Sequence, residues 1–323
     1  MSTRNLIICC DGTWNDTENM DGGEYAPTNV LQFYEALAKV GNKQLSYYED
    51  GVGARQMEAL PGGMFGYGLD KRILGAYRWL SKKFSSTSWE PEQNKIFVLG
   101  FSRGAYTARR IAGLVDYCGI AKDPNDDELA LEIYKNQKKQ EIKQLKNMGR
   151  FFDAPIEMVG VWDTVKTTLD PDLNDNLLSP NVVAGYHAMA IDEKRAPFNV
   201  LKWKKDSRVL QKWFAGVHCD VGGGYKETGL ADCAFMWMVN RAFSHGVMFD
   251  ADVMTNRPDP NPKGKIHNSR QGIWKGLPEK TRTINKNDLI DVTVETRLTL
   301  NSYNGENRPE NLPADPKFTS DDD

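Results

Sequence analysis

The chain has no long run of apolar residues. Among its 323 residues, no apolar stretch approaches the roughly 18 residues that a membrane-spanning helix needs. Residues 1–5 lead into only five apolar residues before Asp11, too few for the hydrophobic part of a secretory signal peptide. We therefore expect a protein with no integral membrane segment, either cytoplasmic or exported without a signal peptide.

Cysteine is scarce, and so is any excess of charge of one sign. The five cysteines are an odd number, and Cys9 and Cys10 are adjacent within an apolar stretch. This usage fits reduced thiols better than a disulfide framework. The formal net charge of −3 gives no indication of a nucleic-acid partner. With 40% hydrophobic and 26% charged residues, the composition is that of an ordinary globular protein.

What the sequence does contain is an alternation of short apolar and amphipathic stretches. The patterns predict strands at residues 6–10, 45–48, 95–101, 156–162 and 209–217, and helices at 29–40, 73–84, 103–115 and 231–243. The glycine-rich residues 61–68 are predicted to form a loop between them. This alternation is typical of an α/β fold with a mostly parallel sheet flanked by helices.

The remaining segments are expected to be insertions in, or extensions of, one catalytic core at residues 1–250. The pattern of residues 121–150 predicts an amphipathic helix whose lysine-rich face is solvated. Residues 166–200 are predicted to form a long polar insertion that would cover a substrate. Residues 251–323 are polar and rich in proline. We expect them to wrap around the same domain rather than form a second core.

The motif around which the chain is organised is a G-x-S-x-G at residues 100–104. It lies between the apolar stretch 95–101 and the predicted helix 103–115. A serine on such a strand-to-helix turn forms a nucleophile elbow, in which the flanking glycines allow close approach of neighbouring backbone. Ser102 is therefore a candidate nucleophile. The alternative is a glycine-rich turn with a serine that takes no part in chemistry.

Two further residues complete a candidate catalytic triad with Ser102. Asp163 and His218 each follow a separate predicted strand, and the order Ser, Asp, His is that of the α/β-hydrolases. A serine hydroxyl needs an imidazole to accept its proton, and a carboxylate holds that imidazole in the required tautomer. For Asp163 the alternative is a strand-end carboxylate that binds backbone N–H groups.

The chain offers four histidines, which limits the choice of base. His218 ends a strand and enters a glycine run that would hold it on a tight loop. His187 is the second choice and lies in a stretch that we interpret as helical. His245 lies beside Gly246 at a predicted helix end, and His267 lies in a polar loop.

The turn after the first strand is a candidate for part of an oxyanion hole. One N–H donor is expected from Arg103, the residue after the nucleophile, and a second from Gly12 or Thr13. The alternative is a turn that only ends the strand. Asp11, Asp163 and Asp220 could share one rim of the sheet, but their spacing does not require a metal, and we predict neither a metal nor a cofactor.

Several motifs together resemble a known family. They are CDGTWN at 10–15, TNV at 28–30, YYEDGVG at 47–53, GFSRGAYTARR at 100–110, VWDTV at 161–165, HAMAIDE at 187–193, WFAGVHCDVGGGY at 213–225 and RPENLP at 308–313. This pattern is similar to an uncharacterised α/β-hydrolase domain of bacteria and fungi that includes the catalytic domain of type VI secretion phospholipase effectors. Cys219 departs from the serine expected after the histidine and leaves the triad intact.

The resemblance implies a serine esterase of the lipase or phospholipase type, with Ser102, Asp163 and His218 at the motif positions of its triad. It implies an ester or lipid substrate and a protein partner of secretion or immunity type. The alternative is a catalytically silent hydrolase fold that serves as a binding module in a secretion or defence cluster.

Overall fold

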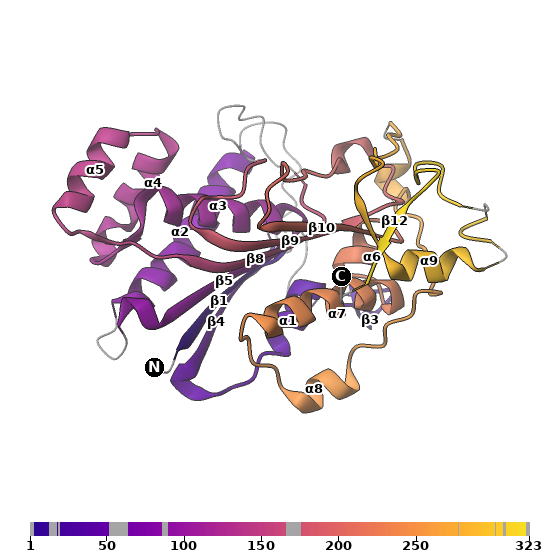
Figure 1. Ribbon diagram of the computed structural model, residues 1–323, viewed down its shortest axis with the longest axis horizontal. Coiled ribbons are helices and arrows are strands. Elements are labelled where there is room, and N and C mark those ends of the chain that lie inside the picture. Colours follow the sequence, from indigo (N-terminus) through magenta and orange to yellow (C-terminus); the bar gives the residue numbers. More distant parts are fainter. Residues whose placement is uncertain are drawn as a thin grey trace.

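An eight-stranded parallel sheet forms the centre of the computed structural model (Figure 1). The structure describes residues 3–12, 18, 20–51, 64–85, 90–165, 176–276, 278–300, 302–305 and 308–320. Within this part of the chain the strand order is β12-β11-β10-β9-β8-β5-β1-β4, and every neighbouring pair is parallel. The prediction of an α/β fold with a mostly parallel sheet is therefore confirmed.

The strands of this sheet are short and apolar. They are β1 Arg4–Cys10, β4 Gln44–Glu49, β5 Asn94–Phe101, β8 Ile156–Trp162, β9 Val182–Ala190, β10 Val209–Phe214, β11 Leu289–Asp291 and β12 Lys317–Thr319. Two small antiparallel ribbons pair β2 Met20–Asp21 with β3 Glu24–Tyr25, and β6 Ile120–Ala121 with β7 Phe151–Phe152. The central strands carry apolar side chains on both faces because helices cover both faces.

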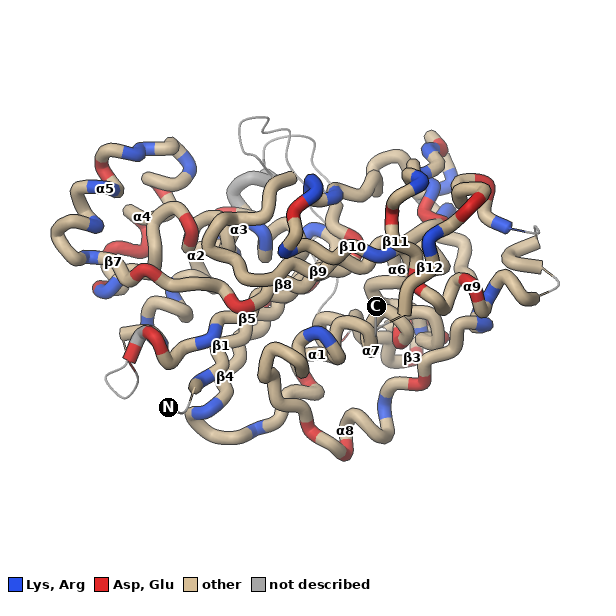
Figure 2. Tube along the Cα trace, viewed as in Figure 1, with Lys and Arg blue, Asp and Glu red and all other residues tan. Residues whose placement is uncertain are grey.

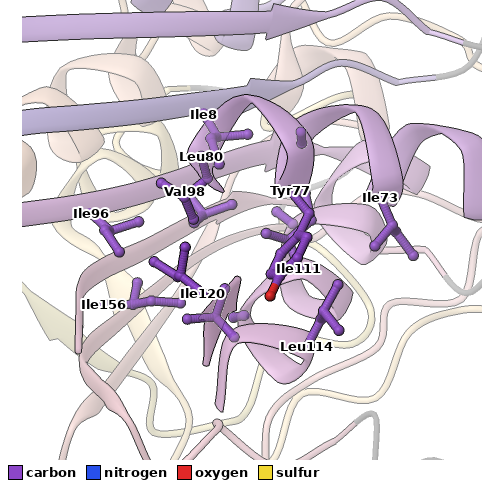
Figure 3. Packing of buried hydrophobic residues seen from close by; sticks show 14 of the residues in the cluster. Ile8, Ile73, Tyr77, Leu80, Ile96, Val98, Ile111, Leu114, Ile120 and Ile156 are labelled. Carbon is purple, nitrogen blue, oxygen red and sulfur yellow. The ribbon is translucent and has the colours of Figure 1, made fainter. Parts of the chain in front are cut away.

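Helices pack on both sides of the sheet (Figure 1). They are α1 Asn29–Glu35, α2 Met64–Phe84, α3 Ser102–Cys118, α4 Asp127–Lys135, α5 Lys139–Asn147, α6 His218–Gly222, α7 Gly229–Ser244, α8 Ala251–Asn256 and α9 Val292–Leu298, with 3-10 turns at Gly41–Lys43, Pro91–Gln93, Pro124–Asp126, Ala196–Phe198 and Gly272–Gly276. α2, α3 and α4 share one apolar core with the sheet, part of which Figure 3 shows, and α1 and α7 share the other.

Several predicted boundaries were wrong. α1 ends at Glu35 rather than at residue 40, and α2 begins at Met64, so residues 64–68 are helical instead of part of a loop. Residues 121–150 form two helices rather than one. α4 ends because Gln137 adopts a positive φ of 52°, which breaks the run of helical hydrogen bonds before α5 begins.

The lysine-rich part of this region carries charges of both signs. Figure 2 shows Lys and Arg together with Asp and Glu on α4 and α5. Lys138 lies 2.7 Å from Glu132 and 3.5 Å from Glu141, and Lys146 lies 3.4 Å from Asp153. These partly exposed pairs are the expected pattern for a solvated helix face.

Residues 166–200 contain a sheet strand that the sequence analysis missed. β9 pairs with β8 on one side and β10 on the other, so His187 is in a strand and not in a helix. Residues 166–175, where the covering insertion was expected, lie outside the described residues.

The C-terminal part of the chain does more than wrap around the core. β11 and β12 extend the sheet beyond β10. The ammonium of Lys212 on β10 is 2% exposed and donates to the carbonyls of Thr319 and Ser320 at 3.2 and 2.6 Å. This buried lysine fastens the last strand to the sheet. None of the described helices is both long and apolar enough to cross a membrane.

Candidate active site

Ser102 lies at the junction between β5 and α3. It is the first residue of the helix, has a φ of +58° and is 6% exposed. Both glycines of the motif are at close approaches. A Cβ at Gly100 would lie 2.5 Å from the carbonyl oxygen of Gly104, and a Cβ at Gly104 would lie 2.2 Å from that of Cys10. The strained serine and the two glycine contacts are the geometry of a nucleophile elbow.

Asp163 occupies the matching position on the neighbouring strand. Phe101 pairs with Trp162, so Ser102 and Asp163 both follow directly after paired strand residues. Asp163 has a φ of +40° and is fully buried. Its Oδ1 accepts the N–H of Ala190 at 2.9 Å. The ends of two adjacent strands thus present the serine and the carboxylate side by side.

His218 is in contact with this carboxylate. Its Nδ1 lies 2.5 Å from Asp163 Oδ2. The imidazole packs between Phe101 and Phe198, with ring centroids 4.5 and 5.0 Å away. His218 begins the short helix α6 rather than lying on a loop, and its backbone N–H donates to Glu193 Oε2 at 3.3 Å.

The third link of the candidate triad is not formed as a hydrogen bond. Within the described part of the chain, the Ser102 hydroxyl makes no hydrogen bond with His218, whose Nε2 likewise has no bonded partner there. Catalytic hydrogen bonds of this kind often tighten only when substrate binds. The structure therefore brings Asp163 and His218 into contact, and places Ser102 next to the phenyl ring that packs on His218.

Charges around the pair set its protonation. Burial alone would favour a neutral Asp163, but Arg282 and the hydrogen bond from His218 outweigh it and hold the pKa of Asp163 far below its usual range. Burial also lowers the pKa of His218 below 6.5, against the opposing effect of Asp163. At neutral pH the pair is thus an ionised carboxylate beside a neutral imidazole, which is the state that a general base requires.

Two groups of charged residues at this site were not predicted from the sequence. Arg282 binds both oxygens of Asp163, at 2.6 and 2.8 Å. Glu193 accepts two hydrogen bonds from the Arg195 guanidinium, each at 2.9 Å, as well as the His218 N–H. Glu193 lies in the HAMAIDE motif, which could have signalled it. Arg282 lies in a polar stretch with no periodic pattern.

Of the predicted oxyanion donors, the structure describes Arg103 and Gly12, and it corrects the role of Gly12. Gly104 of α3 touches the backbone of Cys10 and Asp11, so the turn after β1 lies against the start of α3. The N–H of Gly12, however, donates to the Asp11 carboxylate at 2.6 Å and is already satisfied within the turn. Arg103 lies in the first turn of α3, and Thr13 lies outside the described residues.

In the described part of the chain, the other three histidines make their hydrogen bonds with residues other than Ser102 and Asp163. His187 is buried, accepts the N–H of Thr164 at 3.1 Å, and has a pKa lowered by burial to about 3. His245, at the end of α7 as predicted, contacts Tyr186 and Glu157. His267 lies 2.6 Å from Asp220 and stacks on Tyr225.

The carboxylates weighed as metal ligands bind protein donors instead. Asp11 accepts the hydroxyls of Thr28 and Tyr48 at 2.5 and 2.6 Å. Asp220 accepts from the backbone N–H groups of Val217 and His267, each at 3.0 Å. In the described ranges, no group of three His, Cys, Asp or Glu side chains is arranged to hold a metal ion.

A cavity of about 300 Å³ lies next to this site. Its lining residues come from the loop after β9, from residues 266–270, 303–304 and 309–311, and include Asp192, Val217 and Tyr303. Val217 directly precedes His218, but neither Ser102 nor His218 lines the cavity.

Comparison with known proteins shows the family to which this chain is similar. A family model, described as the type VI secretion system phospholipase effector Tle1-like catalytic domain, matches residues 4–241. The uncharacterised protein YEL023C of Saccharomyces cerevisiae is 28% identical in an alignment of 235 positions that covers 62% of this chain and 33% of the yeast protein. The chain thus spans about a third of that relative.

Two solved structures are also similar. An uncharacterised protein from Pseudomonas aeruginosa has a TM-score of 0.51 and 17% identity, with 78% of this chain and 48% of that chain covered. The Tle1 effector bound to the VgrG spike has a TM-score of 0.43 and 17% identity, with 71% and 52% covered. This chain therefore spans about half the length of each.

Proposed function

Because the chain belongs to the family of Tle1-like phospholipase effector catalytic domains and has an α/β-hydrolase fold, we propose that it is a serine hydrolase of carboxylic esters. In this proposal Ser102 is the nucleophile, His218 the general base and Asp163 the carboxylate that orients it. The favoured substrates are lipids, phospholipids above all.

The proposed reaction runs in two halves. Ser102 Oγ attacks the ester carbonyl carbon while His218 Nε2 takes its proton, and His218 then gives that proton to the leaving alcohol. The acyl group remains on Ser102 until a water, activated by His218, releases it as a carboxylic acid. The N–H group of Arg103 stabilises the negative oxygen that forms in each half.

The observation that carries this proposal is the 2.5 Å contact between His218 Nδ1 and Asp163 Oδ2, together with a serine of positive φ that follows the adjacent strand β5. A histidine held by its Nδ1 on a fully buried, ionised carboxylate presents its Nε2 for proton transfer. The elbow supplies the group whose proton it would take.

Support for phospholipid as substrate comes from the family and from charge near the elbow. Arg103 directly follows the nucleophile, and burial together with the neighbouring Arg72 lowers the pKa of its guanidinium to about 10. In this proposal the Arg103 guanidinium, on the residue after the serine, provides a positive charge for a phosphodiester headgroup. Because the family is one of secretion-system effectors, the same proposal includes a protein partner from such a system and export through it.

Ester hydrolysis by the purified protein tests this proposal. Wild type should hydrolyse a short-chain nitrophenyl ester and release fatty acid from phosphatidylethanolamine vesicles, and Ser102→Ala should lower both rates at least about 1000-fold. Ser244→Ala, an exposed serine at the end of α7, is the matched control and should keep the wild-type rates.

The outcomes separate the alternatives. Hydrolysis of the short ester without release from vesicles would overturn the lipid substrate but not the ester hydrolase. Undiminished turnover by Ser102→Ala would remove Ser102 as nucleophile. A folded wild type that hydrolyses neither substrate would favour the silent binding module.

A further inference from the structure

The guanidinium of Arg282 is the main protein cation bound to the candidate catalytic carboxylate. Its side chain is 1% exposed. Nη1 donates to Asp163 Oδ1 at 2.6 Å and Nη2 to Oδ2 at 2.8 Å, a two-point contact that fixes the plane of the carboxylate. The same two nitrogens donate to the carbonyls of Ala190 and Phe198, at 2.7 and 2.5 Å. Arg282 thus joins the ends of β8 and β9 to the segment that supports His218.

Arg282 comes from outside the residues that the family model matches. That match ends at residue 241. Arg282 lies in the segment 278–282, here called the strap, which runs beside residues 194–196. Two backbone hydrogen bonds hold the strap there, from Ala196 N–H to Pro278 at 3.1 Å and from Lys280 N–H to Lys194 at 2.8 Å. The strap therefore docks on the loop that also carries Glu193 and Arg195.

Asn311, within the RPENLP motif at 308–313, fastens Arg282 itself. Its amide donates to the carbonyl of Arg282 at 3.0 Å and to the carbonyl of Ile191 at 3.1 Å. One side chain thus ties the backbone of the arginine to the end of the strand whose Ala190 N–H binds Asp163. This contact gives the motif a structural role that its sequence did not suggest.

We propose that Arg282 is a positioning residue for His218, acting through Asp163, and that Asn311 holds it in place. The inference rests on the proposed function. The fork of Arg282 fixes the rotation of the Asp163 carboxylate, so that Oδ2 always faces His218 Nδ1. The segment after residue 241 then contributes two residues, Arg282 and Asn311, on which the geometry of the active site depends.

The charge of Arg282 also sets when His218 becomes protonated. The charged groups that act on His218 are Asp163 at the end of β8, and Glu193 and Arg195 on the loop after β9; Cys219 follows it on α6. Arg282 offsets the charge of Asp163. Without it, the uncompensated carboxylate favours the imidazolium, and the base is lost at a higher pH than in the wild type.

The test compares Arg282→Met with Arg297→Met on the short-chain ester as a function of pH. Arg297 is the matched control, because it too is a buried arginine of the C-terminal segment. It donates to the carbonyls of Pro262, Gly264 and Tyr303, and none of its hydrogen bonds is to Asp163. Arg282→Met should lower kcat about 100-fold with KM nearly unchanged, and raise the acid limb of the kcat/KM profile by about one pH unit.

Arg297→Met should lose stability and keep the kcat and pH profile of the wild type. Arg282→Lys keeps the charge without the fork, so it should keep the acid limb and recover only part of kcat. If Arg282→Met does not fold, Asn311→Ala tests the inference in its place. We expect this variant to have a lower kcat and an unchanged KM.

The inference would be overturned if Arg282→Met had the same kcat, and the same acid limb of the pH profile, as Arg297→Met. So would an Asn311→Ala variant with wild-type kcat, where Arg282→Met does not fold. A wild type without ester turnover would instead reject the proposed function, so the two failures are distinguishable.

Discussion

Ser102 and Asp163 share a backbone conformation that side-chain-bearing residues rarely adopt. Their φ values of +58° and +40° place both in the left-handed region, where a non-glycine residue costs of the order of 1 kcal/mol. Both lie directly after paired residues of adjacent strands. Such strain persists where the surrounding packing enforces it, and here it turns the two side chains out of the sheet at one place.

Asp11 is a buried carboxylate whose backbone lies close to Gly104 of the elbow. It accepts hydrogen bonds from Thr28, Tyr48 and Gly12, yet burial raises its pKa to about 6. The folded chain thus keeps a proton on Asp11 between pH 3.8 and about 6, where the unfolded chain has released it. In that window the free energy of unfolding falls as the pH rises.

Replacement of this carboxylate makes the effect measurable. Asp11→Asn cannot ionise, so the stability of wild type relative to Asp11→Asn should fall by up to about 3 kcal/mol between pH 4 and pH 7. Urea unfolding of both proteins across this range gives the difference, and other carboxylates such as Asp192 cancel because both proteins carry them. A difference that does not change with pH would show that Asp11 is ionised throughout.

The helices and strands that could be predicted from the sequence are those with a clear pattern within their own residues. β1, β5 and β8 are buried on both faces, and their unbroken apolar stretches are unambiguous. β9 was misassigned at its histidine because it is rich in alanine and glycine, which carry no strand preference. Its pairing with β8 and β10 makes it a strand, and that pairing is not visible in the local sequence.

Helix α6, which carries His218, is fastened to α1 by one buried side chain. The Asn29 amide donates to the carbonyl of Val221 in α6 and to that of Ala231 in α7, each at 2.9 Å. The backbone N–H of Gly224 adds a bond to the carbonyl of Pro27 at 3.1 Å. The position of the catalytic candidate on α6 thus depends on a residue near the N-terminus.

Asn29→Ala should therefore affect both stability and turnover. Two buried carbonyls lose their donor, so the free energy of unfolding should fall by about 2–4 kcal/mol, and kcat should fall because α6 is no longer fixed. Asn136→Ala removes an exposed amide that also donates to a carbonyl, and should change stability by less than about 0.5 kcal/mol. An Asn29→Ala protein with wild-type stability and turnover would contradict this role.

At the scale of the whole molecule, the C-terminal segment is where prediction from the sequence failed. Ser102, Asp163 and His218 could be proposed from the sequence because each follows a recognisable strand. β11 and β12 have three residues each, and Arg282 lies in no regular element, so nothing local marks them. Only the folded structure shows that β11 and β12 extend the sheet and that Arg282 binds the carboxylate of Asp163.

The fold thus gathers parts from both ends of the chain around Ser102. The turn after β1 lies against α3, α1 holds α6, and the C-terminal strap holds Asp163. If this assembly is a serine hydrolase, the serine must be far more reactive than an ordinary hydroxyl, because only an activated serine attacks a fluorophosphonate.

The central claim is therefore tested most directly by the site at which the intact protein reacts with a fluorophosphonate probe. Peptide mapping by mass spectrometry should find one adduct, on Ser102. The adduct should be absent from Ser102→Ala and should form far more slowly in His218→Gln. An adduct on another residue, or equal labelling of wild type and His218→Gln, would contradict the account.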